Sequence, residues 1–184
     1  MNNPEPIARA HKDEARDVRQ SLEAHQLTTR QRLLVMALNV IPFLHMASVV
    51  WMAALPWPGW PGRLLSALTM LYILPALIAR LIIRFFPIKQ AVIAPGTADF
   101  FKWWALLNLQ LVFCRFPFLD ECLRLVPALY SGWLRMWGAH IGRLVYWAPG
   151  TRILDRSFLD IGDDVIFGAG VKLNPHVMAR NDKG

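Results

Sequence analysis

The stretch "IGDDVIFGAGVKLNPH", residues 161–176, decides the fold in which this chain ends. Large apolar residues recur in it every six positions, at Ile161, Phe167 and Leu173, and glycine follows the first two. An α-helix repeats about every 3.6 residues and an ordinary strand about every 2, so neither matches this period. A six-residue period is typical of a parallel β-helix with a triangular section, in which each six residues cover one flat side.

The same frame extends back to Ile141. Written in sixes, the chain gives two coils, 141–158 and 161–178, separated by two extra residues at 159–160. The first position of every six is large and apolar, and the fifth is small or β-branched. The first position would fill the interior of the prism, and each coil would hydrogen-bond to its neighbour. The sequence therefore predicts the start of a parallel β-helix over 138–184.

The chain before these repeats has the composition of a membrane segment. Of its 184 residues 55% are hydrophobic and 18% are charged. Residues 33–55 contain no Lys, Arg, Asp or Glu, and residues 64–86 contain only Arg80 and Arg84. At about 1.5 Å per residue, either stretch covers the ~30 Å hydrocarbon core of a bilayer. Together with the Pro- and Gly-rich turn between them, they predict a transmembrane helical hairpin over 33–86.

Basic residues orient this hairpin. They are frequent in the polar helix expected over 1–32 and again from Arg80 to Lys89, whereas the turn has only Arg63. The positive-inside rule then places both termini in the cytoplasm, in a multi-pass protein of the inner (cytoplasmic) membrane. The net charge of +7 lies at the ends of apolar segments, which disfavours nucleic acid as a partner. The charged first 32 residues also disfavour a cleavable signal peptide.

Residues 97–137 remain apolar without forming a convincing span. The run "WWALLNLQLVFC", 103–114, has only twelve uncharged residues, too few to cross a bilayer. The following run mixes tryptophans with Arg124 and Arg135, as helices lying in a membrane interface do. Interfacial helices at the cytoplasmic surface are expected here, with a short re-entrant segment as the alternative.

The segments "GAHIGRLVYWAPGTRILD", 138–155, and "LDIGDDVIFGAGVKLNPHVM", 159–178, resemble the hexapeptide-repeat acyltransferases, which have a left-handed β-helix. The succession of membrane segments and coils looks like the membrane-bound subgroup, including the C-terminal part of some peptide synthetases. The resemblance covers roughly the last 45 residues. It implies transfer of an acyl group from a thioester of coenzyme A or acyl carrier protein to a hydroxyl or amine acceptor at the cytoplasmic membrane surface.

The resemblance also assigns residues to this chemistry. In that family a histidine at a coil corner is the general base, and His176 in "LNPHV" matches it. A histidine can take up a proton at neutral pH and return it to the leaving thiol. Asn174 would orient the substrate or polarise the thioester carbonyl. The alternatives are a polar corner residue at 176 and a turn former at 174.

Other polar residues lie within the hairpin. Arg80 and Arg84 share a helix face and either extend to the interface or bind the phosphate of an anionic lipid or carrier as substrate-binding residues. Asn39 and His45 stand in lipid-facing sequence, where ionisable groups are functional candidates. A neutral His45 bonded to a backbone carbonyl beside Pro42 is the structural alternative.

No metal is expected in this chain. The acidic residues of the coils, Asp155, Asp163 and Asp164, are scattered and are predicted to make corner turns. Cys114 and Cys122 match no metal or redox spacing and are predicted to be reduced structural thiols.

Family members usually build more than two coils and associate as trimers. Three readings therefore stay open: a front piece of a longer enzyme, a chain whose open edge another subunit covers, or a chain that has lost catalysis. The partners expected are a membrane lipid or lipid-linked acceptor, and either a homotrimer or a chain supplying further coils. The alternative function is a non-catalytic membrane subunit or scaffold whose open β-helix edge pairs with a partner chain.

Overall fold

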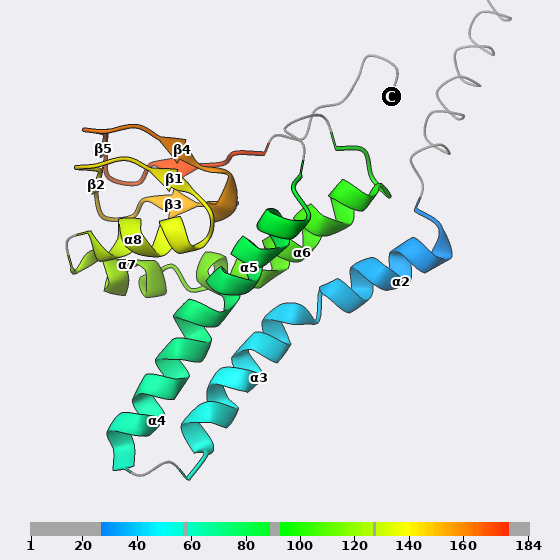
Figure 1. Cartoon of the computed structure of the whole chain (residues 1–184), viewed down its shortest axis with the longest axis horizontal. Coiled ribbons are helices and arrows are strands. Elements are labelled where there is room, and N and C mark those ends of the chain that lie inside the picture. Colours follow the sequence, from blue (N-terminus) through cyan, green and yellow to red (C-terminus); the bar gives the residue numbers. More distant parts are fainter. Residues whose placement is uncertain (1–26, 57–58, 89–92, 127, 177–184) are drawn as a thin grey trace, which may run out of the picture.

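The computed structural model describes residues 27–56, 59–88, 93–126 and 128–176, so most of the helix expected over 1–32 lies outside the described residues. Two helical segments come first and lie side by side (Figure 1). The first consists of α2 (Thr29–Leu38) and α3 (Ile41–Ala54). The second consists of α4 (Gly59–Leu68), the π-helix η1 (Thr69–Ile73) and α5 (Leu74–Phe85). Both segments are long and apolar enough to cross a membrane.

The surface of the two segments is apolar and uncovered by the rest of the chain. Phe43, Val50, Trp51 and Leu65 are each between 64% and 75% exposed. Soluble proteins rarely leave so many large apolar side chains in water along one surface. This exposure fits the membrane association expected from the sequence.

His45 compensates for a break in the second helical segment. Pro75 has no N–H, so one carbonyl group in the preceding turn lacks its usual donor. His45 Nε2, on α3, lies 3.1 Å from the carbonyl oxygens of both Met70 and Leu71 in that turn. Because carbonyl oxygens only accept, Nε2 carries the proton and joins the two segments. The contact fits the structural alternative for His45, although its partners lie on the facing segment and not beside Pro42.

Three more helices follow: α6 (Ala98–Arg115), α7 (Phe118–Arg124) and α8 (Leu129–Met136). α6 packs against α2, α3 and α5, and it buries Leu106, Leu109 and Phe113 together with the polar Asn108 and Gln110. A helix that is covered on several sides has no single apolar face. This explains why its sequence has almost no helical amphipathicity.

The strands form three parallel pairs, as the repeat in the sequence predicts. The first row is β1 (His140–Ile141), β2 (Tyr146–Trp147) and β3 (Arg152–Ile153). The second row is β4 (Asp160–Ile161), β5 (Ile166–Phe167) and β6 (Lys172–Leu173), after the short 3-10 helix η2 (Arg156–Phe158). In the pair β1–β4, Ile141 lies opposite Ile161, and the other two pairs keep the same offset. That offset equals three sixes plus the two extra residues.

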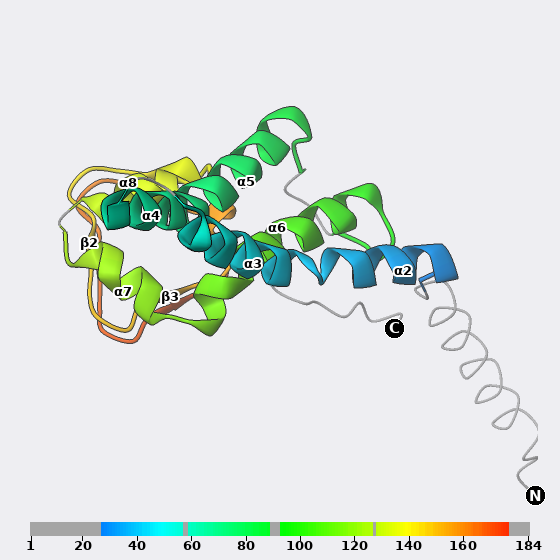
Figure 2. The same cartoon turned by 90° about the horizontal axis from the view of Figure 1, so that it is seen from below.

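Side chains from α7 and α8 cover the outer edge of the first row. Figure 2 views the molecule from the turn of the hairpin, with the strand rows behind these helices. Arg135 donates from Nε to the Ile141 carbonyl at 2.9 Å and from Nη2 to the Gly142 carbonyl at 2.7 Å. Arg124 Nη2 donates to the Thr151 carbonyl at 2.7 Å. These bonds satisfy backbone groups that would otherwise remain open to another strand.

The close approach of the two rows at Gly142 makes a testable prediction. A Cβ built on Gly142 would lie 2.4 Å from the backbone carbonyl of Gly162, whereas a Cβ on Gly162 meets nothing within 4 Å. Because backbone atoms cannot move aside cheaply, Gly142→Ala is expected to lower the free energy of unfolding by about 1–3 kcal/mol. Gly162→Ala is the control and is expected to change it by less than about 0.5 kcal/mol. Thermal unfolding of the detergent-purified variants checks this; equal shifts in Tm would contradict it.

Candidate active site

His176 and Asp155 form a hydrogen-bonded pair where the second row turns back toward α6. The Nδ1 atom of His176 is bonded to Oδ2 of Asp155, whose side chain is fully buried, while the His176 side chain is 30% exposed. A carboxylate oxygen only accepts, so Nδ1 carries the proton. Among the described residues Nε2 has no hydrogen-bond partner. The imidazole is therefore held in the tautomer whose Nε2 lone pair can accept a proton.

Two side chains of α6 hold the Asp155 carboxylate. Trp103 Nε1 donates to Oδ2 at 3.2 Å, and Gln110 Nε2 donates to Oδ1 at 3.1 Å. Trp103 and Gln110 are seven residues apart, about two helical turns, so both project from one face of α6. The Trp103 ring also packs edge-on against His176, with centroids 5.1 Å apart. α6 thus positions both members of the pair.

Arg156 extends this network into the protein interior. Its Nη2 donates to Asp120 Oδ2 at 2.8 Å, and its backbone N–H donates to Gln110 Oε1 at 3.0 Å. Burial alone would lower the pKa of Arg156, but the neighbouring Asp120 carboxylate and Tyr130 raise it above its ordinary value. Burial, reinforced by the charge of Asp120, raises the pKa of Tyr130 as well. Arg156 therefore stays charged and Tyr130 stays protonated, and the Tyr130 hydroxyl donates to Asp120 at 3.2 Å.

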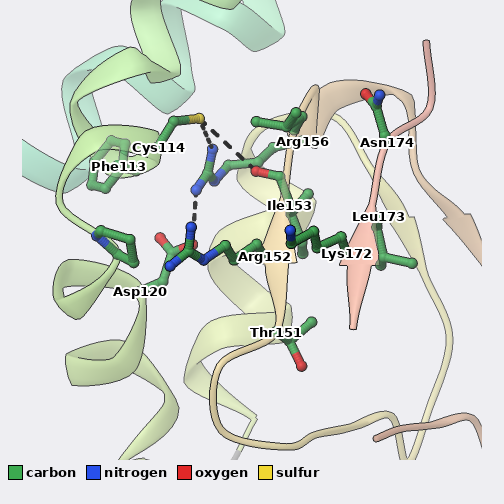
Figure 3. Close-up of a pocket in the computed structure, with 12 residues that line it drawn as sticks. Phe113, Cys114, Asp120, Thr151, Arg152, Ile153, Arg156, Lys172, Leu173 and Asn174 are labelled. Atoms are coloured by element: carbon green, nitrogen blue, oxygen red, sulfur yellow. Dashed lines mark hydrogen bonds and ion pairs between the residues drawn. The ribbon is translucent and has the colours of Figure 1, made fainter. Parts of the chain in front are cut away.

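A cavity of about 280 Å³ lies beside this network, between α6–α7 and the strand pair β3–β6 (Figure 3). Asn174, two residues before His176, lines it, and so do Leu154 and Arg156 on either side of Asp155. Their chain neighbours Asp155 and His176 are not among the residues that line the cavity.

The cavity wall combines apolar and charged groups. Phe113 and Ile153 provide apolar surface, and the exposed Arg152 and Lys172 stand opposite each other on β3 and β6. Within the part of the chain that the structure describes, Asp120 Oδ1 and Arg156 Nε are buried without a hydrogen-bond partner. The positive charges of Arg152 and Lys172 at the cavity suit an extended ligand with an anionic end.

The residues singled out in the sequence fall into two groups. Asn174 lines this cavity, and His176 follows it by two residues without being among the lining residues, whereas Arg80 and Arg84 line a different cavity between α5, α8 and β1. Cys114 and Cys122 are free thiols. Over the described residues no group of three or more His, Cys, Asp and Glu side chains could hold a metal ion.

Sequence reasoning missed the role of Asp155. It does occupy a turn, with φ of 56°, as expected, but its carboxylate is also buried against His176. The repeat frame contained the signal: with an offset of 20, Asp155 aligns with residue 175, next to His176. Trp103 and Gln110 gave no such signal beyond the polarity of Gln110 in an apolar run.

Comparisons with protein-family models, with curated proteins and with solved structures found no match to this chain.

Proposed function

We propose that this protein is a membrane-bound acyltransferase that moves an acyl group from a thioester donor to a hydroxyl or amine acceptor at the cytoplasmic membrane surface. One observation carries the proposal: the buried Asp155 orients His176, whose Nε2 has no hydrogen-bond partner among the described residues. The two rows of strands would be the first coils of a left-handed β-helix, with which the sequence resemblance agrees.

His176 would act as the general base. Its Nε2 would take the proton of the acceptor O–H or N–H while that oxygen or nitrogen attacks the carbonyl carbon of the thioester. The carbon–sulfur bond then breaks, and the proton passes from the imidazolium to the departing thiolate. Asp155 would stabilise the imidazolium between these steps, because its carboxylate accepts the Nδ1–H bond.

The cavity would hold the donor. Acyl-CoA and the phosphopantetheine arm of acyl carrier protein both carry phosphate on an extended chain, and Arg152 and Lys172 supply positive charge at the cavity. Asn174, which also lines it, would donate to the thioester carbonyl.

The hairpin would fix this site close to its acceptor. We propose that it is a multi-pass segment of the inner membrane with both termini cytoplasmic, because two helical segments are long and apolar enough to cross and because basic residues gather at their outer ends. Anchoring raises the effective concentration of a lipid or lipid-linked acceptor at the site.

The test is acyl transfer in membranes that contain the folded chain. Membranes carrying wild type, His176→Ala or His140→Ala receive labelled acyl-CoA and lipid extract, and labelled acceptor is measured. Transfer is expected from wild type and from His140→Ala, whose exposed imidazole pairs with Asp160, and is expected to disappear in His176→Ala. Absence of transfer by the inserted wild type, with acyl carrier protein thioesters also tried, would contradict the proposal.

One observation favours the second candidate, a non-catalytic membrane subunit or scaffold. Ile166 on the second row is 76% exposed, and Phe167 and Leu173 beside it are only half-buried. A further coil, from a partner chain or a trimer mate, would cover them by strand addition. The test is cross-linking from an Ile166→Cys variant in membranes where the chain is folded but shows no acyl transfer. Capture of a partner chain there would favour this candidate.

A further inference from the structure

A second cavity, of about 360 Å³, lies where α5 passes α8 and β1. Three arginines line it: Arg80 and Arg84 from α5 and Arg135 from α8. The remaining described lining residues are Ile83 and the segment 138–141, so none of the described residues in the wall is acidic. His140 contributes little net charge there, because it pairs with Asp160 at 2.8 Å.

The structure fixes two of these guanidinium groups. Arg135 is held by its bonds to the carbonyl groups of Ile141 and Gly142. Arg80 Nη1 donates to the Arg135 carbonyl at 2.9 Å. Arg84 lies one turn after Arg80 on the same face of α5, and within the described residues it has no hydrogen-bond or ion-pair partner. Like charges around one cavity repel, and an anion among them removes that repulsion.

The position of the cavity indicates the source of the anion. On α5 the side chains of Leu77, Leu81 and Phe85 are exposed and apolar, and they alternate along the helix with the two arginines. Apolar surface for lipid chains and guanidinium groups therefore occur at the same height of the helix. This combination fits a molecule that has acyl chains and a phosphate, and guanidinium groups match phosphate oxygens with paired hydrogen bonds.

We propose that this cavity binds the phosphate headgroup of an anionic phospholipid, with its acyl chains along α5. The site would lock the end of the hairpin to α8 and to the first strand, and so would set the height of the strand rows above the bilayer. The inference depends on insertion of the hairpin in a membrane and not on acyl transfer, so each can fail without the other.

The test uses the full chain purified in a neutral detergent, with phosphatidylglycerol, phosphatidylcholine or inorganic phosphate added. Phosphatidylglycerol is expected to raise Tm with a saturable dependence, and the other two are expected not to. One arginine near an anionic lipid surface contributes about a 5-fold change in affinity, so Arg84→Gln should need about 5-fold more phosphatidylglycerol for the same shift. The matched control is Arg63→Gln, an exposed arginine at the other end of the hairpin, which should titrate like wild type.

Several results would overturn the proposal. An equal response to phosphatidylcholine would indicate general lipid solvation, and a full response to inorganic phosphate alone would indicate a site for a soluble anion. If Arg84→Gln titrated like wild type, or if Arg63→Gln lost as much affinity for phosphatidylglycerol as Arg84→Gln, the cavity would not be the lipid-binding site. Arg84 is the deciding position, because its exposed side chain has no partner in the described structure whose loss would unfold the variant.

Discussion

Replacing Asp155 by asparagine is expected to lower the rate constant of acyl transfer by about 10²–10⁴-fold, the usual contribution of general acid–base catalysis. Asp155 receives N–H groups from His176, Trp103 and Gln110, so both of its oxygens must accept. An asparagine would turn an NH₂ group toward one of these donors. Gln110 cannot rotate its own amide in response, because its oxygen accepts from the backbone of Arg156.

The measurement is kcat with saturating donor for Asp155→Asn, His176→Gln and the double variant. When two residues act as one unit, replacing either of them already removes their joint contribution to the rate. The double variant is therefore expected to be no slower than the slower single variant. Asp163→Asn is the matched control, since Asp163 is an exposed coil aspartate that bonds Arg143 and lies away from the cavity lining. Wild-type kcat in Asp155→Asn would contradict a catalytic role for the pair.

Replacing Asp120 by alanine is expected to lower the free energy of unfolding by about 3–5 kcal/mol, the cost of removing one partner of a buried ion pair. Arg156 is 1% exposed, and a guanidinium group in a protein stays charged after its partner has gone. The Tyr130 hydroxyl would lose its acceptor in the same variant.

Thermal unfolding in detergent would measure this loss. The control is Asp160→Ala, whose ion pair with His140 is solvent-exposed and is expected to contribute about 0–1 kcal/mol. The double variant Asp120→Leu with Arg156→Met removes both charges and is expected to recover much of the stability. Equal shifts in Tm for Asp120→Ala and Asp160→Ala would show that the buried ion pair contributes no more to stability than the exposed one.

The strand rows could be predicted from the sequence because their signal is local. Each six carries its own inward residue, and four of these, Ile141, Trp147, Ile153 and Ile161, are buried in the structure. The two extra residues at 159–160 likewise account for the offset between the rows. The apolar helical segments are equally local, because length and composition define them.

The packing of α6 on the rows could not be predicted in this way. Nothing in a local period indicates which face of a mostly buried helix meets which strand. The contacts of Trp103 and Gln110 with Asp155, and of Asp120 with Arg156, join segments 36 to 52 residues apart. The sequence could therefore propose the histidine but not the groups that hold its partner.

The side chains that cover the first row give the strand rows a direction of assembly. A ribosome delivers α7 and α8 before any strand, so Arg124 and Arg135 are already present when the first row emerges. We expect the helices to serve as the nucleation surface, with later rows added on the edge that points away from them. Folding of this region would be vectorial, in step with translation, and each completed row would be the template for the next.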